Sequence, residues 1–328
     1  MRISIRHQLS VTPPPGTANL VLQLLLTPKS GPTQDVESWT VDVQGMEHAA
    51  VFYDAYGNTT HMVNQARPEG ELLVNVSGVV NTRDTNGVLG RPGGEPVVAL
   101  YKRMTQMTRV PVTLYGKYRG DKNSRLDILH GLMLRVSDTL ATTVRQQAPA
   151  PDASAQSQGQ SQDGMTQSMG SMTQSMGGMS QSMGSGGSSQ SMGAEPEGAL
   201  VPPPETVETD QPPVNEEPGH EVVVRLPLPP ATEYAHMFIG AARALGIPAR
   251  FVTGYLVGTD DEPAKFHAWA EAYTEKLGWI GFDPMLELCS TDRHVRLAVG
   301  LDSLSAAPLR CVPAGEGVVD NGVEITRL

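Results

Sequence analysis

Aromatic residues are scarce in this sequence: they make up 5% of its 328 residues, and hydrophobic residues together reach 39%. Globular domains usually contain about 45–50% apolar residues, because a packed core needs them. The low hydrophobic content therefore indicates that part of the chain lies outside any core, although the length is sufficient for about two domains.

Positive charge is also in short supply. Lys and Arg number 24 against 35 Asp and Glu, which gives a formal net charge of -11. Phosphate backbones and anionic lipid surfaces attract clusters of Lys and Arg, and the sequence contains no long basic run. We therefore expect neither a nucleic acid nor a membrane among the partners.

Long hydrophobic runs are missing as well, and cysteines are few. The densest apolar run, residues 20–26, is far shorter than the roughly 20 residues that span a bilayer. Residues 1–11 alternate polar and apolar like a strand and lack the continuous apolar stretch of a secretory signal. The two cysteines, Cys289 and Cys311, provide no disulfide framework. These features predict a cytoplasmic protein with reduced thiols.

Residues 1–110 have the pattern of short antiparallel strands. Val41 and Val43 alternate with polar residues, as do Leu72 and Val74, so that one face of each strand is apolar. Clusters of Pro, Gly and Asn separate the candidate strands. The pattern predicts an N-terminal antiparallel β-sandwich-like domain.

A connecting segment, residues 111–147, contains one candidate helix. Apolar residues recur there at three- and four-residue steps over residues 125–145, which places them on one helical face. Ser124 and Asp127 resemble a capping box that satisfies free backbone N–H groups. We assign this helix to the second domain.

Residues 148–221 consist almost entirely of Gln, Ser, Gly, Met, Pro and Glu. Such a segment cannot bury enough apolar surface to offset its ordering entropy, so we expect a disordered insertion. The tetrapeptide Gln-Ser-Met-Gly recurs at positions 167, 174, 181 and 190. Three interpretations stay open: a tandem duplication without structural role, a Met-lined partner-binding segment, and thioether capture of Cu(I).

Apolar periodicity returns in residues 222–328. A helix is expected around residues 235–245, and Gly246 stands where a left-handed C-cap is usual. Strand-like segments follow at residues 249–256, 266–273 and 279–283. A helix followed by an antiparallel meander predicts an α+β domain.

Two of these strands place a histidine near a carboxylate. If Tyr273 lies opposite Trp279 in a hairpin, His267 and Asp283 become diagonal neighbours on one face. A carboxylate beside an imidazole fixes its tautomer, as in a catalytic base and its orienting group. Such a pair also occurs on solvated sheet faces without any function, and the spacing alone leaves both interpretations open.

Four longer stretches resemble the core of bacterial transglutaminase-like proteins. They are residues 241–255 (AARALGIPARFVTGY), 267–271 (HAWAE), 278–284 (GWIGFDP) and 292–300 (DRHVRLAVG). The N-terminal β region, with Asp54 to Asn58, is similar to the accessory domain of the same proteins. The resemblance implies a papain-like fold in which a helix packs on an antiparallel sheet.

The family resemblance also implies a thiol mechanism, in which a Cys at a helix N-terminus attacks an amide carbonyl. His267 and Asp283 match the base and the orienting group of that mechanism, but the nucleophile position is Ala231. The other candidate cleft residues are Trp269, Glu233 and Tyr234. A methyl group cannot act as a nucleophile, so the resemblance implies a degenerate Cys-His-Asp triad.

Three functional hypotheses follow. The first is a non-catalytic transglutaminase-like protein that binds a peptide or protein, including an active relative as a candidate partner. The second is a working thiol amidase, peptidase or transamidase with Cys289 as a displaced nucleophile. The third is an interaction protein that acts through its low-complexity insertion. No histidine spacing suggests a metal site, and we expect no cofactor.

Overall fold

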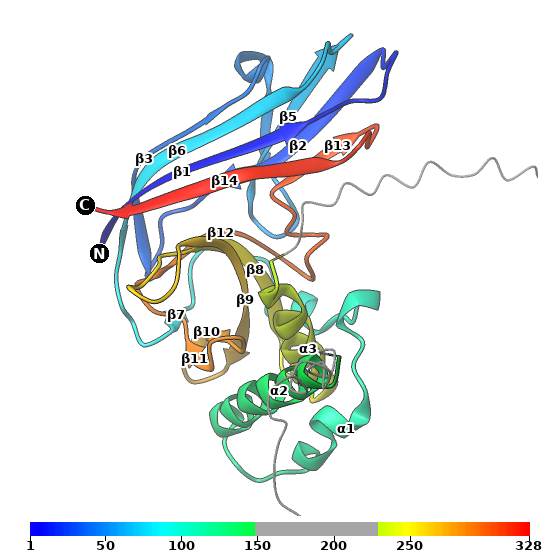
Figure 1. Ribbon diagram of the computed structural model, residues 1–328. Coiled ribbons are helices and arrows are strands. Elements are labelled where there is room, and N and C mark those ends of the chain that lie inside the picture. The colour runs from blue at the N-terminus through cyan, green and yellow to red at the C-terminus, as the bar shows by residue number, and fades with distance from the viewer. Residues whose placement is uncertain (148–228) are drawn as a thin grey trace, which may run out of the picture. The chain divides into compact units, whose positions relative to one another are not determined.

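Three antiparallel sheets and three α-helices make up the described part of the chain, residues 1–147 and 229–328 of a computed structural model (Figure 1). The strands are β1 Arg2–Val11, β2 Asn19–Thr27, β3 Gln34–Asp42, β4 Ala50–Tyr53, β5 Thr59–Ala66, β6 Leu72–Thr82, β7 Val88–Gly90, β8 Ala249–Leu256, β9 Lys265–Thr274, β10 Gly278–Asp283, β11 Leu288–Cys289, β12 His294–Gly300, β13 Leu309–Val312 and β14 Val318–Arg327. The helices are α1 Val112–Tyr115, α2 Arg125–Gln147 and α3 Ala231–Ala244. Short 3-10 helices occupy Met46–His48, Val98–Lys102, Gln106–Thr108 and Gly116–Tyr118.

The N-terminal region forms the expected sandwich of two four-stranded sheets, with strand orders β14-β1-β6-β3 and β13-β2-β5-β4. Alternate residues of the long strands point inward, as the period-two pattern predicts; Ile3, Ile5, Leu22 and Leu24 are fully buried. The same hydrophobic cluster includes Tyr255 of the third sheet. The sandwich core therefore continues into the core domain.

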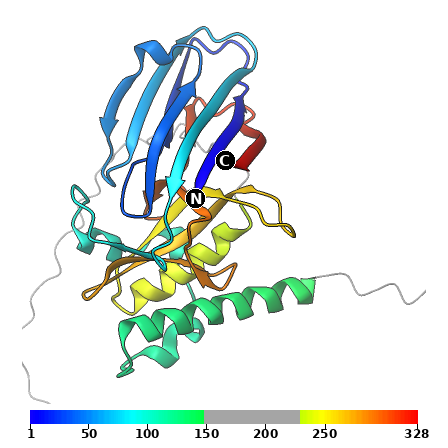
Figure 2. The ribbon, with the colours of Figure 1, turned by 90° about the vertical axis from the view of Figure 1, so that its left-hand side faces the viewer.

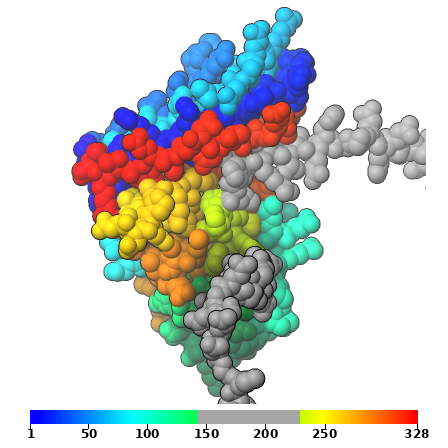
Figure 3. Space-filling model, in the orientation of Figure 1, coloured from blue at the N-terminus to red at the C-terminus, as the bar shows by residue number. Residues whose placement is uncertain are grey.

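The last two strands belong to the sandwich, which differs from the assignment of all residues 222–328 to the core. β14 pairs with β1 and β13 pairs with β2, both antiparallel. Figure 3 shows the red C-terminal segment lying along the blue N-terminal segment. These strands cover the outer edges of β1 and β2, which would otherwise expose unpaired backbone groups. Conversely, β7, within the segment 1–110 assigned to the N-terminal domain, pairs with β10 of the core sheet.

The core sheet has the order β11-β10-β9-β8-β12, and α3 packs against one of its faces. The small side chains of Ala268, Ala270 and Ala272 on β9 let the helix approach closely, and Ala235 and Phe238 of α3 share their hydrophobic cluster. Figure 2 shows α2 running beneath α3, whose other side it covers with apolar residues of the same cluster. The predicted helix on an antiparallel sheet is confirmed.

Most of the predicted elements match the observed ones. Strands expected at 249–256, 266–273 and 279–283 correspond to β8, β9 and β10, and the helix at 125–145 corresponds to α2. Gly246 has φ 77°, the left-handed conformation expected after α3. The insertion at 148–221 lies outside the described residues. Within residues 1–147 and 229–328, no helix is both long and apolar enough to cross a membrane.

The turn between β9 and β10 yields a stability prediction, because it sets the register of the hairpin that carries the predicted His–Asp pair. Gly278 has φ 76°, and a Cβ there would lie 2.1 Å from the carbonyl oxygen of Gly90. Gly278→Ala should therefore lower the free energy of unfolding by about 2–4 kcal/mol in chemical denaturation. Gly93→Ala, at a site with no atom within 4 Å of the new Cβ, is the control and should change it by less than about 1 kcal/mol. Equal effects of the two changes would contradict this account of the turn.

Candidate functional site

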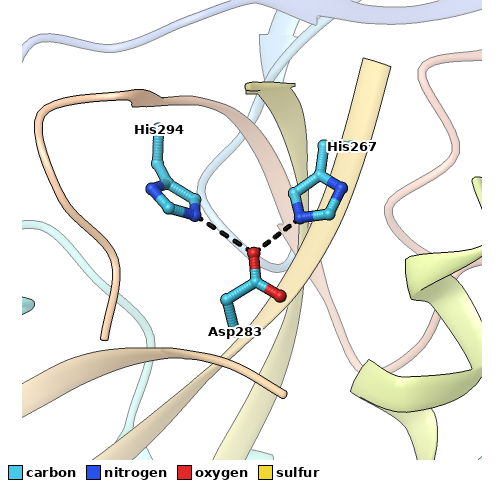
Figure 4. A group of neighbouring side chains, drawn as sticks. All are labelled: His267, Asp283 and His294. Atoms are coloured by element: carbon cyan, nitrogen blue, oxygen red, sulfur yellow. Dashed lines mark hydrogen bonds and ion pairs between the residues drawn. The ribbon is translucent and has the colours of Figure 1, made fainter. Parts of the chain in front are cut away.

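A buried imidazole–carboxylate pair lies on the β9–β10 hairpin. The structure places Trp279 opposite Tyr273, which is the register assumed in the sequence analysis. In that register His267 Nε2 lies 2.6 Å from Asp283 Oδ2 (Figure 4). His267 is 1% exposed and Asp283 is fully buried, so the pair does not lie on a solvated face.

His294 completes the cluster from a third strand. Its Nε2 lies 3.1 Å from the same Asp283 Oδ2, so the carboxylate stands between the two imidazoles (Figure 4). The sequence analysis found no partner for His294. Its strand, β12, reaches the hairpin only through β8, and this order of strands cannot be read from residue spacing. The only signal in the sequence was its position within the stretch 292–300.

The Asp283 carboxylate has all its acceptor sites in use. Its Oδ1 accepts hydrogen bonds from the backbone N–H groups of Met285 and Leu286, at 3.1 and 3.2 Å. Burial alone would raise the pKa of Asp283, but the hydrogen bonds from His267 and His294 outweigh burial and hold the pKa well below its usual range. The group is therefore an ionised acceptor for both rings.

The ring of His294 is held in one tautomer. Its Nδ1 accepts a hydrogen bond from the backbone N–H of Thr291 at 3.1 Å, so the proton of the neutral ring is on Nε2, facing Asp283. Ligand atoms of His267, Asp283 and His294 lie within 4.8 Å of one another, which is close enough to consider a metal ion. A protonated Nε2 cannot bind a metal, so the donors fit a hydrogen-bonded cluster better than a metal centre.

Trp269 packs against both imidazoles of this cluster. Its indole lies edge-on to His294 with ring centroids 5.2 Å apart, and it stacks with His267 at 6.3 Å. The indole occupies the space beside Gly254, where a Cβ would come within 2.7 Å of the ring. Trp269, a candidate cleft residue of the sequence analysis, is 2% exposed and packs against both histidines.

Glu271, on the same face of β9, takes part in a buried ion-pair network. Its carboxylate lies 2.6 Å from Arg250 Nε and 2.9 Å from Arg296 Nε, and Arg250 also pairs with Glu95 at 2.7 Å. Burial would raise the pKa of Glu271, but Arg250 and Arg296 outweigh it and lower that pKa. Arg250, Glu271 and Arg296 come from three different sequence stretches of the family resemblance, and the network joins those stretches in space.

Ala231 is the first residue of α3 and is 1% exposed. Pro230 is the N-cap and supplies no side-chain hydrogen bond to the helix. Of the neighbouring candidate residues, Glu233 is exposed and Tyr234 is half-buried against the hydrophobic cluster of the core. A helix N-terminus without a thiol therefore stands at the position where the resemblance implies a nucleophile.

The two cysteines lie elsewhere. Cys289 Sγ is 3.5 Å from Nε2 of His130 on α2, and no described contact joins it to His267. Burial raises the pKa of the Cys289 thiol, and it raises that of Cys311, which is buried on β13 in the sandwich, to about 11. The candidate displaced thiol of the sequence analysis thus lies beside His130, whereas the resemblance assigns the role of base to His267.

The fold matches that of a solved structure. It is shared with the crystal structure of a protein of Cytophaga hutchinsonii described as a candidate cysteine protease, at a TM-score of 0.54 and 14% identity. The match covers 99% of this chain and 88% of that one. The likeness is one of fold.

Two family models match parts of this sequence. Residues 212–284 match the transglutaminase-like superfamily, and residues 3–81 match the bacterial transglutaminase-like N-terminal region. The chain thus carries a transglutaminase-like core behind a bacterial transglutaminase-like N-terminal region, and the family suspected from the sequence is confirmed.

Mycobacterial proteins share part of this sequence. An uncharacterized protein of Mycobacterium leprae is 37% identical over 105 residues, which are 29% of this chain and 37% of that protein. An uncharacterized protein of Mycobacterium tuberculosis is 30% identical over 108 residues, covering 28% and 34% of the two chains. The matches span about a third of these relatives' length, so substrates and partners are matters of proposal.

The cluster predicts a specific pH dependence of stability. Burial lowers the pKa of His294, and the hydrogen bond to Asp283 offsets only part of this effect. Because the unfolded chain then binds more protons as the pH falls below about 6.5, His294 should make the free energy of unfolding decrease in that range. His294→Gln keeps an N–H donor but does not titrate. Denaturant titrations from about pH 7.5 to 5.5 should therefore show a flatter decrease for the variant, by at most about 1.4 kcal/mol per pH unit. Parallel curves would contradict the assignment.

Proposed function

We propose that this chain is a non-catalytic transglutaminase-like protein that binds a peptide or protein at the site of His267 and Asp283. One observation carries the proposal. The base and its orienting carboxylate are hydrogen-bonded at 2.6 Å, whereas α3 begins with Ala231 at the position of the family's nucleophile. A thiol mechanism requires the nucleophile within hydrogen-bond reach of its base, and a methyl group cannot fill that role.

The proposal includes the partners and the location expected from the sequence. The partner is a peptide or protein, with an active relative as one candidate, and the protein is cytoplasmic. The excess of acidic over basic residues argues against nucleic acid and anionic membranes as ligands. An intact imidazole–carboxylate pair provides a hydrogen-bonding group for a peptide amide even where no bond is broken.

The absence of turnover is the first expected result. Incubation of the full chain with a pool of fluorogenic peptide amides, with and without an added amine acceptor, should give rates equal to those of His267→Ala. The reason is that the imidazole has no thiol to deprotonate. Rates above that control would contradict the non-catalytic assignment.

Restoring the thiol tests whether the rest of the site is intact. If Ala231 faces His267, as the family resemblance implies, the new thiol of Ala231→Cys should titrate below the usual value of about 8.5, because the helix N-terminus and the imidazole both favour the thiolate. The ultraviolet absorbance of the thiolate measures this titration. The double variant Ala231→Cys/His267→Ala is the matched control and should titrate at a higher pH. Ordinary and equal titration in both would show that Ala231 does not face His267, against the proposal.

A second candidate function rests on the contact between Cys289 and His130. The separation of 3.5 Å allows a hydrogen bond between thiol and imidazole, which is one requirement of an active thiol amidase. Burial raises the pKa of this thiol, which favours its unreactive form. If the full chain does turn over an amide, loss of activity in both Cys289→Ser and His130→Ala would support this alternative, and activity in either variant would exclude it.

A third candidate, an interaction protein that works through residues 148–221, concerns a segment outside the described residues. Deletion of that segment should leave peptide binding intact under the present proposal, because His267 and Asp283 both lie outside it. Loss of binding on deletion would favour the insertion as the interacting part.

A further inference from the structure

A pocket lies beside the first turns of α3. It has a volume of about 670 Å³, within the range of about 300–1,000 Å³ usual for ligand sites. One wall is the segment around the 3-10 helix Gln106–Thr108, and the other is the start of α3. Gly240 lets these elements approach closely, since a Cβ there would meet the carbonyl oxygen of Thr108 at 2.1 Å. Neither Ala231 nor His267 lines this pocket, but Glu233, a candidate cleft residue of the sequence analysis, does.

Thr232, whose hydroxyl has no hydrogen-bond partner among the described residues, lines the pocket at the helix N-terminus. Thr232 is 5% exposed, and its Oγ1 is buried without a hydrogen-bond partner. A buried hydroxyl without a partner is costly, and a bound acceptor would remove the cost. The N-cap Pro230 supplies no side-chain acceptor to the helix, so the start of α3 also favours a negative group.

His236 and Arg109 add two further donors. His236 Nε2 accepts a hydrogen bond from the backbone N–H of Ser303 at 3.0 Å, and burial lowers the pKa of His236 to about 4. The neutral ring therefore carries its proton on Nδ1. Arg109 is exposed at the pocket and has no ion pair among the described residues. The donors of this pocket match an anionic group with several acceptor lone pairs.

The remaining walls are mainly apolar. They consist of methionine, valine and proline side chains, namely Met107, Val110, Pro111, Pro229 and Met237. Such walls suit an aliphatic side chain attached to the anionic group. A carboxylate with an aliphatic side chain is what the last residue of a peptide chain presents.

We propose that this pocket binds the C-terminal carboxylate of a peptide or protein that ends in an aliphatic residue. Arg109, the Thr232 hydroxyl and the N-terminus of α3 hold the carboxylate, and the apolar walls hold the side chain. Glu233 is the opposing charge at the pocket and reduces the affinity. The inference can be tested apart from the proposed function, because the carboxylate and side-chain contacts of this pocket use neither His267 nor Asp283.

Fluorescence anisotropy of the full chain with the probe fluorescein-Gly-Gly-Leu tests the proposal. The free acid should bind at least about tenfold more tightly than the same peptide as its C-terminal amide. Arg109→Met should weaken binding of the acid about fivefold, and Thr232→Val should do the same. Glu233→Gln should strengthen it about twofold. Arg109 and Glu233 are exposed, so these two substitutions leave folding intact.

Three results would overturn the proposal. Equal affinity for the acid and the amide would show that the pocket does not recognise the carboxylate. The absence of saturable binding up to millimolar peptide would show that the pocket does not bind such a peptide. Binding that is lost in His267→Ala but unchanged in Arg109→Met would show that the peptide binds at the site of His267 and Asp283 and not in this pocket. That last result would support the proposed function and contradict this inference. The inference itself predicts that binding of the peptide is unchanged in His267→Ala.

Discussion

The Asp283 carboxylate accepts four hydrogen bonds, two from imidazoles and two from backbone N–H groups, in a position closed to solvent. Its imidazole donors, His267 and His294, come from β9 and β12, which are not neighbours in the sheet. A buried charge is tolerated only where such donors surround it. This arrangement requires three features of the fold: the register of the β9–β10 hairpin, the close contact between Trp269 and Gly254, and the position of β12 in the sheet.

A second buried charge network lies on the same sheet. Arg250, Glu271 and Arg296 link β8, β9 and β12, and of these three residues Arg250 and Glu271 are fully buried while Arg296 is partly exposed. Removing one partner from such a set usually costs more than the pair contributes, because the remaining charge is left unpaired. The sequence stretches of the family resemblance therefore stabilise the sheet through these networks. This structural role does not depend on a nucleophile at the position of Ala231.

The sequence predicted the local features correctly and missed the ones that depend on strand order. Alternation of Leu72 and Val74 identified a half-buried strand, and the hairpin register assumed in the sequence analysis, with Tyr273 opposite Trp279, is the observed one. The second imidazole at Asp283, the neighbour of Cys289 and the return of β14 to β1 each depend on which strands or helices lie side by side. Periodicity carries no information on such long-range neighbours.

The central claim is that the imidazole of His267 is set as a base for a nucleophile that the chain does not provide. Side-chain ¹⁵N NMR of the labelled full chain at about pH 8.5, above the ordinary titration range of histidine, tests it most directly. The account predicts Nε2-protonated rings for both His267 and His294, with Nδ1 of His267 unprotonated. A His267 ring protonated on Nδ1 would contradict the hydrogen bond to Asp283 and with it the account of the site.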